Sequence, residues 1–287
     1  MKKKFTEEEI KYILISTLIL GFCFSFRWRG SFSVNNWFSA LRSSLIIIGL
    51  ALSIKIAVQK YISSRISCQV EYKIWKSGLI LALITTIASL GYIIWAAPGA
   101  VRIINKTRFR IGKAKDEIHP GPRDHALIAV AGVFVFFIFA LIGKILLSTG
   151  DSIFGDKLLF IGSYLAIFNL IPFVYPHNTV PPVIAKGNLP TLEGVLIFFG
   201  SRSIWAFSFS FILISVLGFL FLGTGASLII AIVGSILLFL LWYYYVEPWG
   251  IASPTSDRFY RDYYDTFSKK PRDMGKWKWQ SKHEKYK

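Results

Sequence analysis

Residues Ser44 to Tyr61 read SLIIIGLALSIKIAVQKY, and this stretch decides how the rest of the chain is interpreted. The stretch is apolar enough to lie in a bilayer, yet it carries Lys55 near its end. Small residues recur at every fourth position and predict a narrow helix face for close packing of a second helix: Gly49, Ser53 and Ala57. Two interpretations are open. Either this stretch is the central helix of an intramembrane site, or it is an ordinary span whose Lys55 ammonium snorkels to the interface beside Gln59 and Lys60.

The composition is typical of a membrane protein. Of the 287 residues, 54% are hydrophobic, whereas soluble domains are about 45–50% apolar. Several apolar runs approach the roughly 20 residues that cross a bilayer and carry one charge or none. We therefore expect an all-α polytopic protein with about six to seven transmembrane helices. The membrane domain is predicted over residues 1–250, followed by a basic, aromatic-rich tail over residues 251–287.

The net charge of +17 favours membrane lipids as partners rather than nucleic acid. The basic residues lie between apolar runs and in the tail, and the chain has no zinc-finger, helix-turn-helix or RNA-binding signature. The distribution of Lys and Arg among the connectors predicts a multi-pass protein of the cell membrane with both termini in the cytoplasm. The cytoplasmic excess is largest if the apolar run from Gly78 to Ala97 enters the bilayer and returns to the same face. Its length of 20 residues favours a full span instead.

Local patterns predict several elements around these runs. Thr6 and Glu9 have the spacing of a capping box at the start of a first helix. Apolar and polar residues alternate from Val70 to Trp75, which predicts a strand. Val101–Ile104 and Arg108–Gly112 are predicted to form a small β-hairpin at the membrane surface.

A series of short blocks follows in a fixed order along the chain. The blocks are Ala57-Val58-Gln59-Lys60-Tyr61, Glu71-Tyr72-Lys73-Ile74-Trp75, Ala96-Ala97-Pro98-Gly99, Gly121-Pro122, Asn169-Leu170-Ile171-Pro172 and Leu192-Glu193-Gly194. Together they resemble the site-2 protease family of intramembrane zinc metalloproteases, in particular an archaeal multi-span branch. The resemblance implies a site-2 protease-like core over about residues 43–203.

The resemblance implies a zinc site that this chain does not preserve. In the family, two histidines of an HExxH motif and a distant aspartate bind zinc, and the glutamate activates water. Alignment on the Gln59-Lys60-Tyr61 block places Leu50–Ile54 at the HExxH position and Glu193 at the aspartate position. The remaining candidates for a substrate cleft are Asn169, Pro172 and Ser53. We expect no intact catalytic residue, no metal site and no cofactor.

Three functions are compatible with this sequence. The first is a catalytically inactive site-2 protease-like protein that binds or regulates transmembrane or nascent polypeptide segments. The second is an active intramembrane metalloprotease with a non-standard zinc site, for which Glu193 and the set His119, Asp124, His125 and His177 are conceivable ligands. The third is a small-molecule or ion transporter. Transporters typically have paired ionisable residues within their spans and internal repeat symmetry. The apolar runs of this chain carry few such residues and show no repeat, which disfavours this function.

Overall fold

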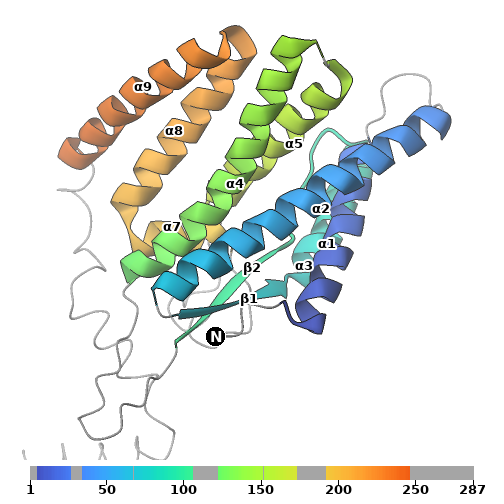
Figure 1. The fold of residues 1–287 in the computed structure, drawn as a ribbon, viewed down its shortest axis with the longest axis horizontal. Helices are drawn as coiled ribbons and strands as arrows, with labels where there is room; N and C mark the ends of the chain where they lie inside the picture. Colours follow the sequence, from blue (N-terminus) through green and yellow to red (C-terminus); the bar gives the residue numbers. More distant parts are fainter. Residues whose placement is uncertain are drawn as a thin grey trace, which may run out of the picture.

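A computed structural model places the chain as a bundle of helices with a small sheet at one end (Figure 1). The structure describes residues 5–26, 34–66, 68–105, 122–150, 152–172 and 192–245. Several features named above lie outside these ranges: the predicted strand Arg108–Gly112, the tail, His119 and His177. The prediction for each of them stays a prediction.

The described helices follow the order of the predicted apolar runs. They are α1 (Glu7–Ser25), α2 (Val34–Arg65), α3 (Lys76–Ala88), α4 (Pro122–Thr149), α5 (Ser152–Leu170), α7 (Glu193–Gly200), α8 (Arg202–Phe221) and α9 (Thr224–Tyr245). Helix α4 is central, because it contacts α2, α5, α7, α8 and α9. Figure 1 shows α8 and α9 on one side of α4, and α1, α2 and α3 on the other. Helices α8 and α9 follow each other in the chain and pack together as a helical hairpin.

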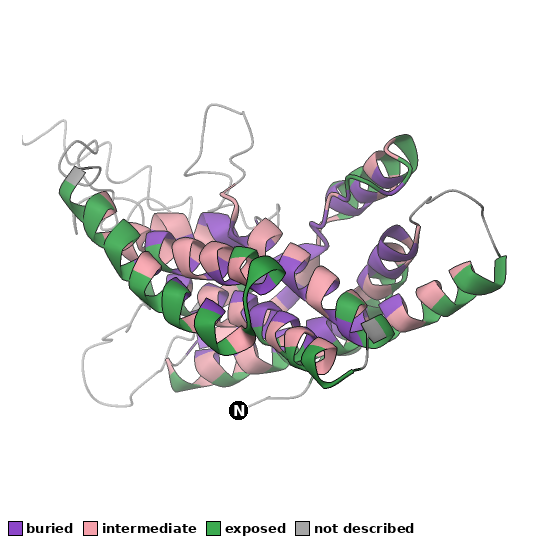
Figure 2. Ribbon diagram, turned by 90° about the horizontal axis from the view of Figure 1, so that it is seen from above, coloured by how far each residue is buried: buried purple, intermediate pink, exposed green. Residues whose placement is uncertain are grey.

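Five of the described helices are long and apolar enough to cross a membrane: α2, α4, α5, α8 and α9. The expectation of six to seven is therefore too high for the part of the chain that the structure describes. Helix α1 has the length, but four charges lie in its first two turns: Glu7, Glu8, Glu9 and Lys11. The buried share of the spanning window falls from 56% in α4 to 17% in α9. Figure 2 shows the exposed residues on the outer helices, where apolar side chains suit lipid. These features indicate a membrane protein.

Glycines bring the backbones of α4 and α5 close together. A Cβ atom on Gly143 would lie 2.3 Å from the backbone nitrogen of Leu159. A Cβ atom on Gly162 would lie 2.5 Å from the backbone nitrogen of Ala140. No side chain fits between the helices at these two positions, so the pair forms a tightly packed centre for the bundle.

The sheet consists of two antiparallel strands, β1 (Cys68–Ile74) and β2 (Gly99–Asn105). Strand β1 confirms the strand predicted from alternation. Val101–Ile104 pairs with β1, and the predicted pairing with Arg108–Gly112 lies outside the described residues. Gly99 has φ +145°, and a Cβ atom there would lie 2.2 Å from the Lys73 carbonyl oxygen. Only glycine fits this close approach.

The apolar run between the strands leaves the sheet and returns to it. Helix α3 has 13 residues, about 20 Å at 1.5 Å per residue, whereas a bilayer core is about 30 Å thick. After α3 the chain turns at Leu90, which has φ 53°, and comes back to β2. The backbone N–H of Trp75 donates to the Pro98 carbonyl at 3.0 Å and closes the base of this segment. This path supports the returning alternative rather than a full span.

Candidate functional site

The candidate site is formed where one face of α2 meets the first residue of α7. Lys55 and Gln59 lie four residues apart on α2, so both side chains lie on the same face. Lys55 Nζ lies 2.8 Å from Glu193 Oε1, and both side chains are 0% exposed. Gln59 Nε2 donates to Glu193 Oε1 at 2.8 Å and contacts the Ile128 carbonyl of α4 at 3.3 Å. Glu193 Oε1 therefore joins α7 to α2, and the Gln59 amide joins α2 to α4.

Of the two interpretations of Lys55, the structure rules out snorkelling. Its side chain is fully buried and does not reach an interface. An unpaired ammonium in such a place would carry a large desolvation cost, and the carboxylate of Glu193 offsets this cost. The ring of Phe136 adds a cation–π contact, with its centroid 5.1 Å from Lys55 Nζ. The site is therefore an internal ion pair of the bundle.

Gly132 of α4 makes room for this pair. A Cβ atom at this position would lie 2.2 Å from Gln59 Nε2 and 3.1 Å from Glu193 Oε2. The smallest residue is therefore needed on the face of α4 that covers the site. The backbone of α4 at Gly132 therefore packs directly against the side chains of Gln59 and Glu193.

The site keeps unused hydrogen-bonding capacity. Among the described residues, Glu193 Oε2 and Gln59 Oε1 are buried and have no hydrogen-bond partner. Lys55 Nζ faces Glu193 Oε1 at 2.8 Å but not along a hydrogen-bond direction, so charge attraction joins the two groups. An ammonium carries three N–H donors. The site thus presents both donors and acceptors that the described residues do not satisfy.

The predicted cleft residues are only partly brought together. Glu193 lies at the centre of the site. Asn169 is buried near the end of α5, where its Nδ2 donates to the Leu165 carbonyl at 2.8 Å. The start of α7 packs on this end of α5, because a Cβ atom on Gly194 would lie 2.5 Å from the Leu170 carbonyl. Pro172 is half-buried just after α5.

Ser53 does not share a contact with Glu193 among the described interactions. Its hydroxyl donates to the Gly49 carbonyl of its own helix at 2.7 Å. In the segment aligned with HExxH, Leu50 is 53% exposed and Ile54 is 43% exposed, so this pair lies away from the buried site. The positions that face Glu193 lie five residues later, at Lys55 and Gln59. Their signal in the sequence is the spacing of two polar residues, one helical turn apart, in an apolar helix.

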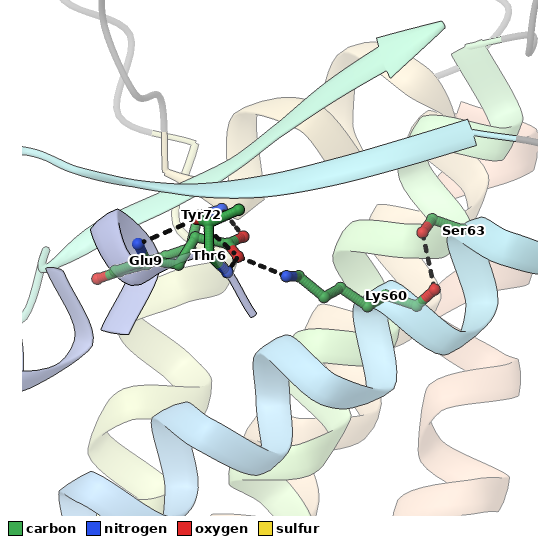
Figure 3. Close-up of polar contacts among 5 residues, drawn as sticks. All are labelled: Thr6, Glu9, Lys60, Ser63 and Tyr72. Carbon is green, nitrogen blue, oxygen red and sulfur yellow. Dashed lines mark hydrogen bonds and ion pairs between the residues drawn. The ribbon is translucent and has the colours of Figure 1, made fainter. Parts of the chain in front are cut away.

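A second cluster lies at the start of α1 (Figure 3). The predicted capping box is confirmed: Thr6 and Glu9 exchange side-chain and backbone hydrogen bonds. The carboxylate of Glu9 is also 2.5 Å from Lys60 Nζ of α2 and accepts the backbone N–H of Tyr72 at 3.1 Å. Burial raises the pKa of Glu9, but the hydrogen bonds from Lys60, Thr6 and Tyr72 outweigh it and lower the pKa below its ordinary value. Glu9 is therefore ionised and 2% exposed.

Tyr72 of β1 lies between the two clusters. Its backbone N–H is bound by Glu9, and its hydroxyl is 2.9 Å from the Ser16 hydroxyl of α1. Burial raises the pKa of the Tyr72 hydroxyl most; the Ser16 hydrogen bond opposes this, and the negative charge of Glu193 raises it further. Tyr72 is thus bound to α1 through both its backbone and its side chain.

The residues of this site do not fit a zinc ion. Zinc is held by imidazole, thiolate or carboxylate groups, whereas an ammonium repels a metal ion and an amide is a weak ligand. Glu193, the one suitable ligand, is engaged by Lys55. Within the described ranges, no group of three or more His, Cys, Asp and Glu residues is placed to hold a metal ion.

The chain was compared with protein-family models, curated proteins and solved structures. No protein-family model, no curated protein and no solved structure matches this chain.

Proposed function

We propose that the protein is a catalytically inactive, site-2 protease-like membrane protein that binds or regulates membrane polypeptide segments. The observation that carries the proposal is the arrangement of Lys55, Gln59 and Glu193. Two positions one turn apart on a buried apolar helix face a carboxylate from the first residue of another helix. A zinc protease places two histidines and an acidic ligand in such an arrangement.

In this proposal the ammonium of Lys55 takes the place of the metal cation. It supplies the positive charge that neutralises Glu193, so α2 and α7 stay joined without a bound ion. Ile56 follows Lys55, at the position where the motif has its glutamate. A side chain without a titratable group cannot activate water for peptide hydrolysis. The geometry therefore favours binding over catalysis.

The sheet offers a surface for an extended polypeptide. Among the described residues the sheet has two strands, so the outer edge of β2 has no strand partner there. An extended segment pairs with such an edge through backbone hydrogen bonds and tolerates many side chains. Membrane lipids contact the exposed apolar helices in this proposal, and both termini lie in the cytoplasm.

Glu193 is also the residue on which an active metalloprotease would depend. Its ion pair with Lys55 leaves one free carboxylate oxygen, Oε2. The observed contacts therefore favour the inactive form over an active enzyme with a non-standard site.

Zinc binding by histidine variants tests the proposal. The double variant Lys55→His with Gln59→His provides two imidazoles facing Glu193, and we expect about one zinc ion per chain, because two histidines and a carboxylate form a zinc ligand set. The matched control, Leu50→His with Ile54→His, has the same spacing on the exposed side and should bind no zinc ion tightly. Metal analysis of the purified proteins gives the answer.

Two outcomes would contradict the proposal. A folded Lys55/Gln59 double-histidine variant that binds no more zinc than the Leu50/Ile54 control would refute the inferred arrangement. Unmodified protein that carries stoichiometric zinc and cleaves a membrane substrate in a chelator-sensitive reaction would refute the claim of inactivity.

A further inference from the structure

The pairing of β1 and β2 determines which backbone groups of β1 point away from the sheet. The register pairs Ile74 with Gly99, and the N–H of Trp75 donates to the Pro98 carbonyl at 3.0 Å. In an antiparallel ladder, hydrogen-bonded pairs alternate with non-hydrogen-bonded pairs. Lys73 therefore bonds to β2, whereas Tyr72 directs its backbone N–H and C=O groups to the outer edge of β1.

Glu9 occupies this outer edge. Glu9 Oε1 accepts the N–H of Tyr72 at 3.1 Å, in the place where the carbonyl oxygen of a third strand would lie. The other carboxylate oxygen is 2.5 Å from Lys60 Nζ. Figure 3 shows the Glu9 side chain between the strand and α2. The carboxylate thus accepts the hydrogen bond that the carbonyl of a neighbouring strand would otherwise accept.

The position is specific to Glu9 among the three acidic residues of the first turn. Glu7 and Glu8 are exposed, whereas Glu9 is 2% exposed. The burial of one carboxylate at a strand edge is not needed for favourable interaction with the helix dipole, because exposed acids also provide it. A local cap alone likewise does not require the contact with Tyr72 or Lys60.

We propose that Glu9 is a displaceable cap on the outer edge of β1, which keeps an extended polypeptide from pairing with Tyr72. This edge cap rests on the proposed function, because it regulates where a bound segment can add to the sheet. With the cap in place only β2 offers a free edge within the described sheet. When the first turn of α1 moves away, the N–H and C=O groups of Tyr72 and Val70 become available to an extended chain. The ion pair between Glu9 and Lys60 links α2 to the edge cap.

Backbone hydrogen exchange of the full chain in lipid nanodiscs tests the edge cap. Glu9→Gln removes the charge and retains the shape, and Lys60→Met releases the carboxylate while leaving the capping box. In both variants we expect the amide of Tyr72 to exchange about tenfold faster, as loss of one charged hydrogen bond implies. The exposed neighbour provides the matched control, Glu8→Gln, which should exchange like the unmodified protein. Unchanged exchange at Tyr72 in both test variants would refute the cap.

A binding measurement separates the edge cap from the proposed function. The probe is a short synthetic peptide of alternating valine and threonine. In the unmodified protein it should slow amide exchange at Val101 and Ile103 of β2 only; in the Glu9→Gln variant it should also slow exchange at Tyr72. Protection confined to β2 in every variant would refute the edge cap and leave the proposed function standing. No protection of either strand would refute polypeptide binding at this sheet, and with it the cap.

Discussion

Helix α2 carries two lysines five residues apart, and each pairs with a glutamate from another helix. Lys55 meets Glu193 with both side chains 0% exposed, whereas Lys60 meets Glu9 with side chains 13% and 3% exposed. The first pair lies among α2, α4 and α7, and the second lies at the margin, beside a strand edge. A fully buried pair is costly to separate, because either charge alone would stay desolvated. The outer carboxylate is less costly to leave without its ammonium, because it also accepts hydrogen bonds from Thr6 and Tyr72. The inner pair is therefore suited to holding the fold and the outer pair to regulating it.

Removing one charge of the inner pair should have the largest effect. We expect Lys55→Met to lower the free energy of unfolding by about 3–5 kcal/mol, since it leaves Glu193 buried without a counter-charge. Combining Lys55→Met with Glu193→Leu should restore most of this loss, because both charges are then absent. The unmodified protein, the single variant and the double variant are compared by chemical unfolding in detergent micelles. A loss of unfolding free energy in the double variant that is as large as, or larger than, the loss in Lys55→Met would show that the two charges are not coupled.

Filling the space beside the inner pair should have the next largest effect. Gly132→Ala places a Cβ atom 2.2 Å from Gln59 Nε2, and we expect a loss of about 1–3 kcal/mol from overpacking. Gly225→Ala is the matched control, because nothing lies within 4 Å of a Cβ atom at that helical position. The control should be neutral or slightly stabilising. Thermal unfolding that ranks the two variants equally would contradict the tight contact of α4 with the site.

Breaking the outer pair should cost less. Lys60→Met should lower the free energy of unfolding by about 1–3 kcal/mol, because Glu9 loses a charged partner but keeps its hydrogen bonds from Thr6 and Tyr72. The comparison with Lys55→Met, measured under the same conditions, is direct because both lysines lie on one helix. An effect of Lys60→Met as large as that of Lys55→Met would remove the distinction between the two pairs.

The smallest expected effect is the response of the outer pair to acid. The pKa of Glu9 is lowered in the folded protein, so its contribution is present above the ordinary glutamate value of about 4.3 and is lost as the pH falls through the folded value. The stability difference between the unmodified protein and Glu9→Gln should therefore shrink as the pH falls below about 4. The group facing Glu9 from α2 is Lys60. A difference independent of pH would exclude an ionised Glu9 from the outer pair.

Local features of the fold could be predicted from the sequence because their causes are local. The capping box of Thr6 and Glu9 involves residues three apart, and alternation from Val70 to Trp75 reports one strand with two different faces. The helical hairpin of α8 and α9 follows from two apolar runs and a short glycine-containing turn.

The site itself could be predicted only in part, because its partners are distant in the sequence. Gln59 and Glu193 are 134 positions apart, and no local pattern indicates that they meet. Glu193 was singled out through the resemblance, whereas Lys55 and Gln59 were not named as site residues because the alignment pointed to Leu50–Ile54, which lies away from Glu193. The pairing of β1 with β2 was not predicted for a related reason. The two strands are separated by the returning helix α3, and no short-range pattern indicates that they meet.

The hydrogen bond from Trp75 to Pro98 has a consequence for biosynthesis. Because its two ends are joined, this segment would enter a bilayer as a closed loop, and no polar flank would have to be transported across the lipid. Lys76 at its beginning and Arg102 beyond its end then remain on one side of the membrane. Two cysteines introduced at these flanking positions should react with an impermeant reagent added to the same compartment.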